Sequence, residues 1–164
     1  MALVSPDSIG LSAFWSQRLL VDCSRRALIT AEHYYAFISA LAQERYHFVQ
    51  IDSQYLLRLM RQHNLTLAPE VVAGISLLSD PACSINSAVN VASGVVAACW
   101  VNPIQPYFRH MVLDAVLGAL TQNRAAQVVL QALTISLVRT LGPRSPATME
   151  IAQIIKLWKR ILFS

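Results

Sequence analysis

Charged side chains are scarce in this sequence: Asp, Glu, Lys and Arg make up 13% of its 164 residues, whereas hydrophobic residues make up 55%. A soluble domain ordinarily carries about twice that share of charge. Either the core is unusually complete, or a sizeable apolar face is covered by a partner. The net charge of +4 comes from basic residues spread along the chain. That charge is compatible with nucleic-acid binding but does not require it.

Cysteines are few, and long apolar runs are missing. Cys23, Cys83 and Cys99 form no CxxC pair, so we expect no disulfide framework and a cytoplasmic protein. The first fifteen residues contain no basic segment and no cleavage site of a signal peptide. No run reaches the ~18 apolar residues of a membrane-spanning helix. Residues 85–101 are interrupted by polar side chains, and residues 125–138 are too few. We therefore expect no membrane insertion.

Residues 29–63 carry the densest set of local signals, which predict a helix, a short strand and a second helix. Thr30 is the predicted N-cap of the first helix, and Asp52 that of the second. In the first helix, the spacing predicts one buried face made of Tyr34, Phe37, Ile38 and Leu41. In the second helix, it predicts one made of Leu56, Leu59, Met60 and His63. Between the helices, residues 46–51 alternate apolar and polar and are rich in strand-favouring side chains.

Proline falls at the ends of the apolar periodic segments, and so does Gly142. The remaining predicted helices cover residues 7–20, 68–78, 85–100, 107–120, 125–141 and 146–162. The sequence thus predicts a mainly all-α fold of about eight helices, a multi-helix bundle or short solenoid, with one strand near 46–51. We expect a single helical domain over 1–164, with a softer part at 1–66 and a firmer part at 67–164.

Two of these helices have informative faces. Residues 107–120 are apolar on nearly every side, so we predict that this helix is the most buried. In the last helix the predicted inner face comprises Ile151, Ile154, Ile155, Trp158, Ile161 and Leu162. Its predicted outer face comprises Lys156, Lys159 and Arg160.

Side chains capable of chemistry are present but do not form a recognised motif. His33, His47 and His63 have neither an HExxH spacing nor an adjacent cysteine pair. The spacing of Asp22, Asp52, Asp80 and Asp114 suggests a two-metal nuclease, but Asp52 and Asp80 are explained as cap and turn residues. We therefore predict no catalytic, metal-binding or cofactor-binding residues, and we do not expect this chain alone to be an enzyme.

The predicted strand has no second strand in its own chain with which to pair. Its edge amides and carbonyls must bond to water, to an irregular segment or to a neighbouring sheet. We therefore predict partner-binding residues at Tyr46, Phe48 and Val49, together with Phe14 on the apolar side of the first helix. The expected partner is another protein or a second copy of this chain.

The segment LITAEHYYAFISALAQERYHFVQIDSQYLLRLM resembles the region just after the nuclease core in bacterial PIN-domain proteins of the TPR-GreAB-C-PIN type. Those proteins continue into an all-helical extension with two tryptophans, whose places Trp100 and Trp158 fit. The resemblance covers roughly Leu19 to the C-terminus. The acid after Leu19-Leu20-Val21, Asp22, is similar to the first acid of a PIN core, and nothing downstream completes that pattern. The resemblance therefore implies a helical tail without its nuclease half.

Together these observations predict a non-catalytic helical interaction module, the C-terminal part of a PIN-domain-like system. A PIN-like metal-dependent RNA nuclease is the alternative, and a membrane-associated helical protein is the third interpretation.

Overall fold

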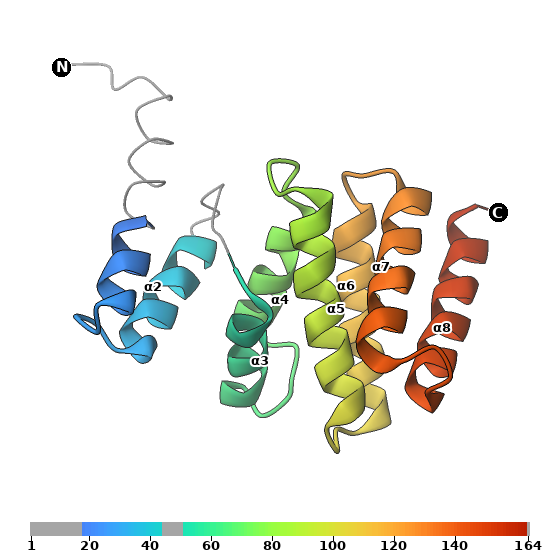
Figure 1. The fold of residues 1–164 in the computed structure, drawn as a ribbon, viewed down its shortest axis with the longest axis horizontal. Helices are drawn as coiled ribbons and strands as arrows, with labels where there is room; N and C mark the ends of the chain where they lie inside the picture. Colours follow the sequence, from blue (N-terminus) through green and yellow to red (C-terminus); the bar gives the residue numbers. More distant parts are fainter. Residues whose placement is uncertain (1–17, 44–50, 164) are drawn as a thin grey trace. The chain divides into compact units, whose positions relative to one another are not determined.

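A computed structural model describes residues 18–43 and 51–163 (Figure 1). All regular structure within these ranges is helical, which confirms the all-α fold class. The predicted strand lies outside the described residues except for Ile51, which has no regular structure, and the predicted helix 7–20 lies mostly outside them too. The chain divides into two compact units, Met1–Ile51 and Asp52–Ser164. The single-domain organisation stays a prediction.

The first unit contains a helical segment over residues 18–25 and helix α2 (Ala31–Gln43). The helical segment ends in a Schellman motif: the Leu28 amide donates to the Cys23 carbonyl at 2.9 Å, and Ala27 adopts a positive φ of 55° where glycine is usual. Thr30 caps α2 as predicted, because its Oγ1 accepts from the His33 amide at 3.2 Å. On the predicted face, Ile38 is buried as expected, but the prediction is wrong for Phe37, which is 41% exposed.

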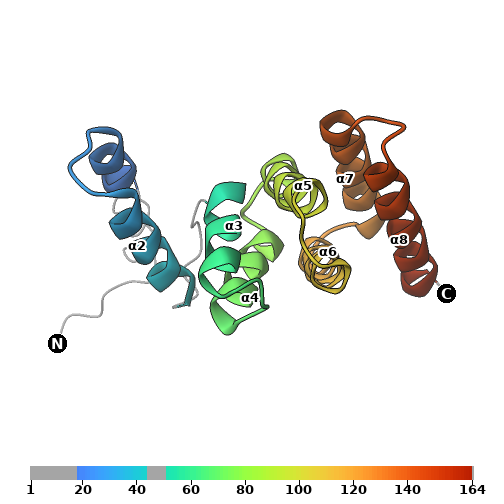
Figure 2. The ribbon, with the colours of Figure 1, turned by 90° about the horizontal axis from the view of Figure 1, so that it is seen from below.

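The second unit is a two-layer array of helices. Its elements are α3 (Ser53–Gln62), α4 (Pro69–Ser76), the 3₁₀ turn η1 (Leu77–Ser79), α5 (Ile85–Val101), α6 (Pro106–Thr121), α7 (Ala126–Leu141) and α8 (Pro146–Leu162). Figures 1 and 2 show α3, α5 and α7 side by side in one layer and α4, α6 and α8 in the other. Successive helices pair into three hairpins, in the manner of a short solenoid.

Local chemistry accounts for the helix boundaries in this unit. Asp52 caps α3, because its Oδ1 accepts from the Tyr55 amide at 2.7 Å. Ser145 caps α8 in the same way, with its Oγ 3.0 Å from the Thr148 amide. Pro69, Pro106 and Pro146 stand in the first turns of α4, α6 and α8, where the missing amide costs no hydrogen bond. The predicted breaks are therefore confirmed.

Helix α5 is the most buried of the described helices. Nine of its seventeen residues are buried, against seven of sixteen in α6. The prediction that residues 107–120 form the most buried helix is therefore wrong, and Tyr107 is 74% exposed. The physical reason is side-chain size: the small residues of α5 allow α3, α6 and α7 to pack against it.

Two contacts show how closely α5 is approached. Gly94 faces α3, where a Cβ added at this position would lie 2.8 Å from Ser53 Cβ. On the side facing α7, the Ser136 hydroxyl donates to Ser93 Oγ at 2.8 Å. Because the van der Waals contact distance between carbon atoms is about 3.5–4.0 Å, the α3–α5 contact leaves no space for a side chain at residue 94.

We predict opposite effects for two glycine substitutions in helix interiors. Gly94→Ala should lower the free energy of unfolding by about 1–2 kcal/mol, because the new methyl group overlaps Ser53. Gly118→Ala should raise it by about 0.5–1 kcal/mol, because its Cβ would meet only Trp158, at 3.9 Å, while helix propensity improves. Urea unfolding followed by circular dichroism checks both values. Equal stabilisation by the two variants would contradict the close approach of α3 and α5.

Candidate functional site

The four predicted partner-binding residues, Phe14, Tyr46, Phe48 and Val49, all lie outside the described residues. The surface that they were expected to form stays a prediction. Three places in the second unit are candidates for a functional site. They are a polar cluster around Glu150, a loop held by Arg124, and the outer face of α8.

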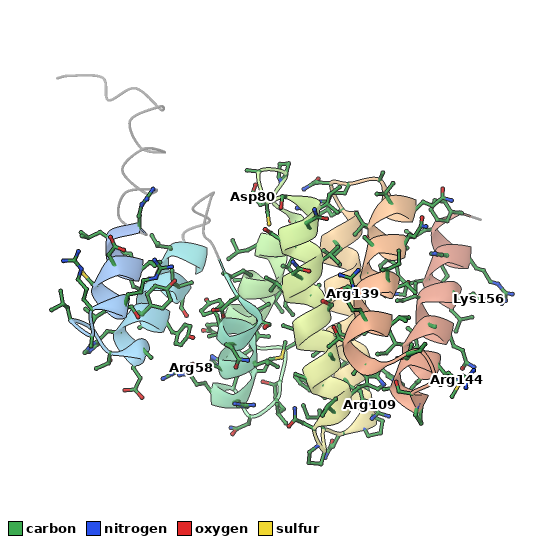
Figure 3. All side chains as sticks on the ribbon, in the orientation of Figure 1. Arg58, Asp80, Arg109, Arg139, Arg144 and Lys156 are labelled. Carbon is green, nitrogen blue, oxygen red and sulfur yellow. The ribbon has the colours of Figure 1, made fainter. Side chains whose placement is uncertain are left out.

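The polar cluster joins α5, α6 and α8 around Glu150, and Figure 3 labels its Arg109. Glu150, near the start of α8, accepts from the indole nitrogen of Trp100 at 2.9 Å, and its Oε1 lies 2.9 Å from Nε2 of His110. Arg109 Nη2 donates to both carboxylate oxygens at 3.3 Å. Arg109 and His110 come from the start of α6 and Trp100 from the end of α5. All three side chains therefore contact the same carboxylate.

Ring contacts hold the donors of this cluster in place. The Arg109 guanidinium lies 5.3 Å from the centre of the Trp100 ring, a cation–π geometry, and the His110 ring stacks on the same indole at 6.0 Å. Desolvation acts to raise the pKa of Glu150. Hydrogen bonds from His110 and Trp100 and the charge of Arg109 outweigh it, so the pKa lies below its ordinary value. Glu150 is therefore a carboxylate at neutral pH that links α5, α6 and α8.

A second pair also connects α6 with α8. The Trp158 indole nitrogen donates to Asp114 Oδ1 at 3.0 Å. Its ring reaches across to Gly118. The backbones of α6 and α8 approach each other less closely than those of α5 and α7, so these long side chains span the space between them. Asp114 thus has a structural role, and Trp158, on the predicted inner face of α8, is half-buried.

The other predicted acids and histidines within the described residues each have a local setting, and His47 lies outside those residues. Asp80 accepts from the Ala82 amide at 2.8 Å in a turn, and Asp22 is exposed in the first unit. His63 lies 3.7 Å from Glu70, and His33 lies 3.2 Å from the Thr30 hydroxyl. Within residues 18–43 and 51–163, no three His, Cys, Asp or Glu side chains lie close enough together to hold a metal ion.

Arg124 holds a loop that sequence reasoning did not single out. Its guanidinium donates to three backbone carbonyls in η1 and the loop that follows it: those of Leu78, Asp80 at 2.7 Å and Cys83 at 3.0 Å. A planar fork of donors suits such a set of carbonyls. Arg124 therefore ties the α6–α7 turn to this loop.

The cysteines of the second unit have raised thiol pKa values. Burial raises the pKa of Cys83, helped by the charge of Asp80 and opposed by Arg124. Burial raises the pKa of Cys99 to about 11. The Cys99 side chain is therefore a thiol, not a nucleophilic thiolate, at neutral pH.

The outer face of α8 carries a row of apolar side chains, Ile154, Leu157 and Ile161, which we call the α8 apolar row. Spacing of three and four residues places them on one side of the helix. Leu157 is 56% exposed and Ile161 is 75% exposed, whereas Ile151 and Ile155 are buried. The predicted inner face of this helix is thus correct for Ile151 and Ile155 and wrong for Ile161 and Leu162, because α8 buries only one narrow stripe and its last turn is exposed.

Cations stand beside this row. Lys156 and Arg160 are exposed on α8, as predicted, and Lys159 is partly exposed. Figure 3 shows Lys156 projecting away from the array. Residues 151–163 contain no Asp or Glu, and these three cations form no ion pair among the described residues. A signal for the row was present in the sequence: the apolar positions of residues 151–162 occupy a wider arc than one buried stripe needs.

No family model matches the chain, and no curated protein or solved structure matches it.

We predict that Glu150→Gln lowers the free energy of unfolding by about 1–2 kcal/mol at pH 7, because Arg109 loses its anionic acceptor. The pKa of Glu150 is lowered in the folded protein, so its contribution is present above the ordinary pKa of about 4.3. The contribution is lost as the pH falls through the lower folded-state pKa. Urea unfolding of both proteins at a series of pH values measures this.

Glu70→Gln is the matched control for this prediction. The Glu70 side chain has the same exposed fraction as that of Glu150, 36%, but its ionic contact is one histidine nitrogen 3.7 Å away. We expect a change below about 0.5 kcal/mol. Equal destabilisation by the two variants would contradict the special role of Glu150.

Proposed function

We propose that this chain is a non-catalytic helical module that binds another protein. The observation that carries the proposal is the α8 apolar row, in which Leu157 and Ile161 are more than half exposed one turn apart. Single exposed apolar residues are normal on a soluble protein, but a contiguous group on one helix face marks an interaction site. A high apolar share and a low charge share across the chain agree with a covered face.

The acids of the second unit support a non-catalytic role, because each already has a structural contact. Asp52 caps α3, Asp80 accepts a turn amide, and Asp114 accepts from Trp158. Glu150 accepts from three side chains, and Glu70 lies beside His63. The alternative, a metal-dependent nuclease, requires carboxylates that converge on ions about 3.5–4 Å apart.

We also propose a partner and a compartment for this module. A PIN-domain-like partner follows from the sequence resemblance, and the residues around Tyr46 and Phe14 are a second proposed contact region. The three cysteines are unpaired, which fits a reducing cytoplasm. None of the described helices is long and apolar enough to cross a bilayer.

Photo-crosslinking in the native host tests this proposal. We predict that a benzoylphenylalanine placed at Leu157 yields one discrete protein adduct, because this position lies on the α8 apolar row. The control is the same side chain at Gln131, an exposed polar position on α7. Mass spectrometry of the adduct distinguishes a second copy of the chain from a different protein. Diffuse adducts of equal intensity at both positions, or no adduct at Leu157, would contradict the proposed function.

A further inference from the structure

The α8 apolar row can contact a partner only through side chains. Backbone amides within an α-helix bond to carbonyls of the same helix, so α8 has no free edge to which a strand could add. Ile154 and Ile161 are about 10 Å apart along the helix axis, at a rise of about 1.5 Å per residue. A row of this length and spacing matches the apolar side of a second amphipathic helix, which presents side chains at the same period.

Charge then selects among such helices. Lys156 and Arg160 are one turn apart on the side of α8 next to Leu157, and both are exposed. The nearest acids along the row are already engaged, since Glu150 accepts from Arg109 and Asp114 accepts from Trp158. The row therefore has an apolar centre and a basic flank, so complementarity requires acidic side chains on the facing helix.

Resting on the proposed function, we infer that the α8 apolar row binds an amphipathic helix whose apolar face is flanked by Asp or Glu. A second copy of α8 fits less well, because its own Lys156 and Arg160 would meet those of the first copy. An anionic membrane surface would satisfy the cations, but surface helices bury a broad apolar face, and here Ile151 and Ile155 are already used inside the protein.

Basic residues near a helix C-terminus also have an ordinary role, because they interact favourably with the helix dipole. Lys159 and Arg160 are in the last turn of α8, whereas Lys156 is not. The test therefore includes Lys156→Glu alone, beside the double variant Lys156→Glu/Arg160→Glu. Circular dichroism of each variant shows whether α8 stays helical.

The probes are three fluorescein-labelled designed peptides of about three heptads with the same leucine row. Their flanking positions are all Glu, all Gln or all Lys, and vesicles of phosphatidylcholine with phosphatidylserine are the fourth probe. We expect the Glu peptide to bind the full chain most tightly by fluorescence anisotropy. Lys156→Glu/Arg160→Glu should weaken this binding roughly tenfold, and Lys156→Glu alone should weaken it less. Leu157→Gln/Ile161→Gln should abolish it.

Arg139→Glu/Arg144→Glu is the matched control, because it makes the same change in net charge at two exposed cations outside α8. We expect its affinity for the Glu peptide to stay within about twofold of the parent. Equal binding of the three peptides, or equal weakening by both charge reversals, overturns the inference. Binding to the anionic vesicles without binding to the Glu peptide also overturns it, in favour of a membrane surface. If the peptides fail but Leu157 still crosslinks to a discrete protein, the partner chemistry is wrong and the proposed function stands.

Discussion

The close approach of α3 and α7 to α5 is the constraint on which the second unit depends. Gly94 leaves no space between α5 and Ser53, and Ser93 forms a hydrogen bond with Ser136 on α7. These contacts bring three helices together in one layer. Small side chains contribute little apolar area of their own, but they allow neighbouring backbones to pack closely. The larger residues of the neighbouring helices are then fully buried, as Leu56, Leu113 and Leu133 are.

The second layer is built differently, and its construction explains the surface of α8. Where α6 and α8 lie farther apart, tryptophan and arginine side chains reach across the space, and the carboxylates of Glu150 and Asp114 accept from them. Helix α8 is therefore held by one buried stripe and by two sets of polar contacts, those of Glu150 and those of Asp114. Apolar side chains outside this stripe stay exposed, Leu157 and Ile161 among them. This geometry and the cations beside it are the observations that support the proposed function.

Local signals in the sequence were sufficient to predict the helices but not to predict which helices and side chains come together. Asp52, Thr30 and Ser145 act within three residues of their own positions, so their roles as caps could be read from sequence alone. The Glu150 cluster joins residues 40 to 50 positions apart, and no local pattern connects Trp100 with Glu150. For the same reason, the apolar character of residues 107–120 predicted burial without showing that α5 occupies the centre. Ile161 was assigned inward because periodicity gives the width of an apolar arc, not how much of it a neighbour covers.

The central claim is that the outer face of α8 is the docking surface for an acidic amphipathic helix. Methyl-resolved NMR tests this most directly, by titrating the designed Glu peptide into the isotopically labelled chain. The claim predicts that the methyl signals of Leu157 and Ile161 shift, while those of Val128 and Ile135 on α7, which are 53% and 52% exposed, stay in place. Shifts of similar size at all four residues, or shifts confined to α7, would contradict it.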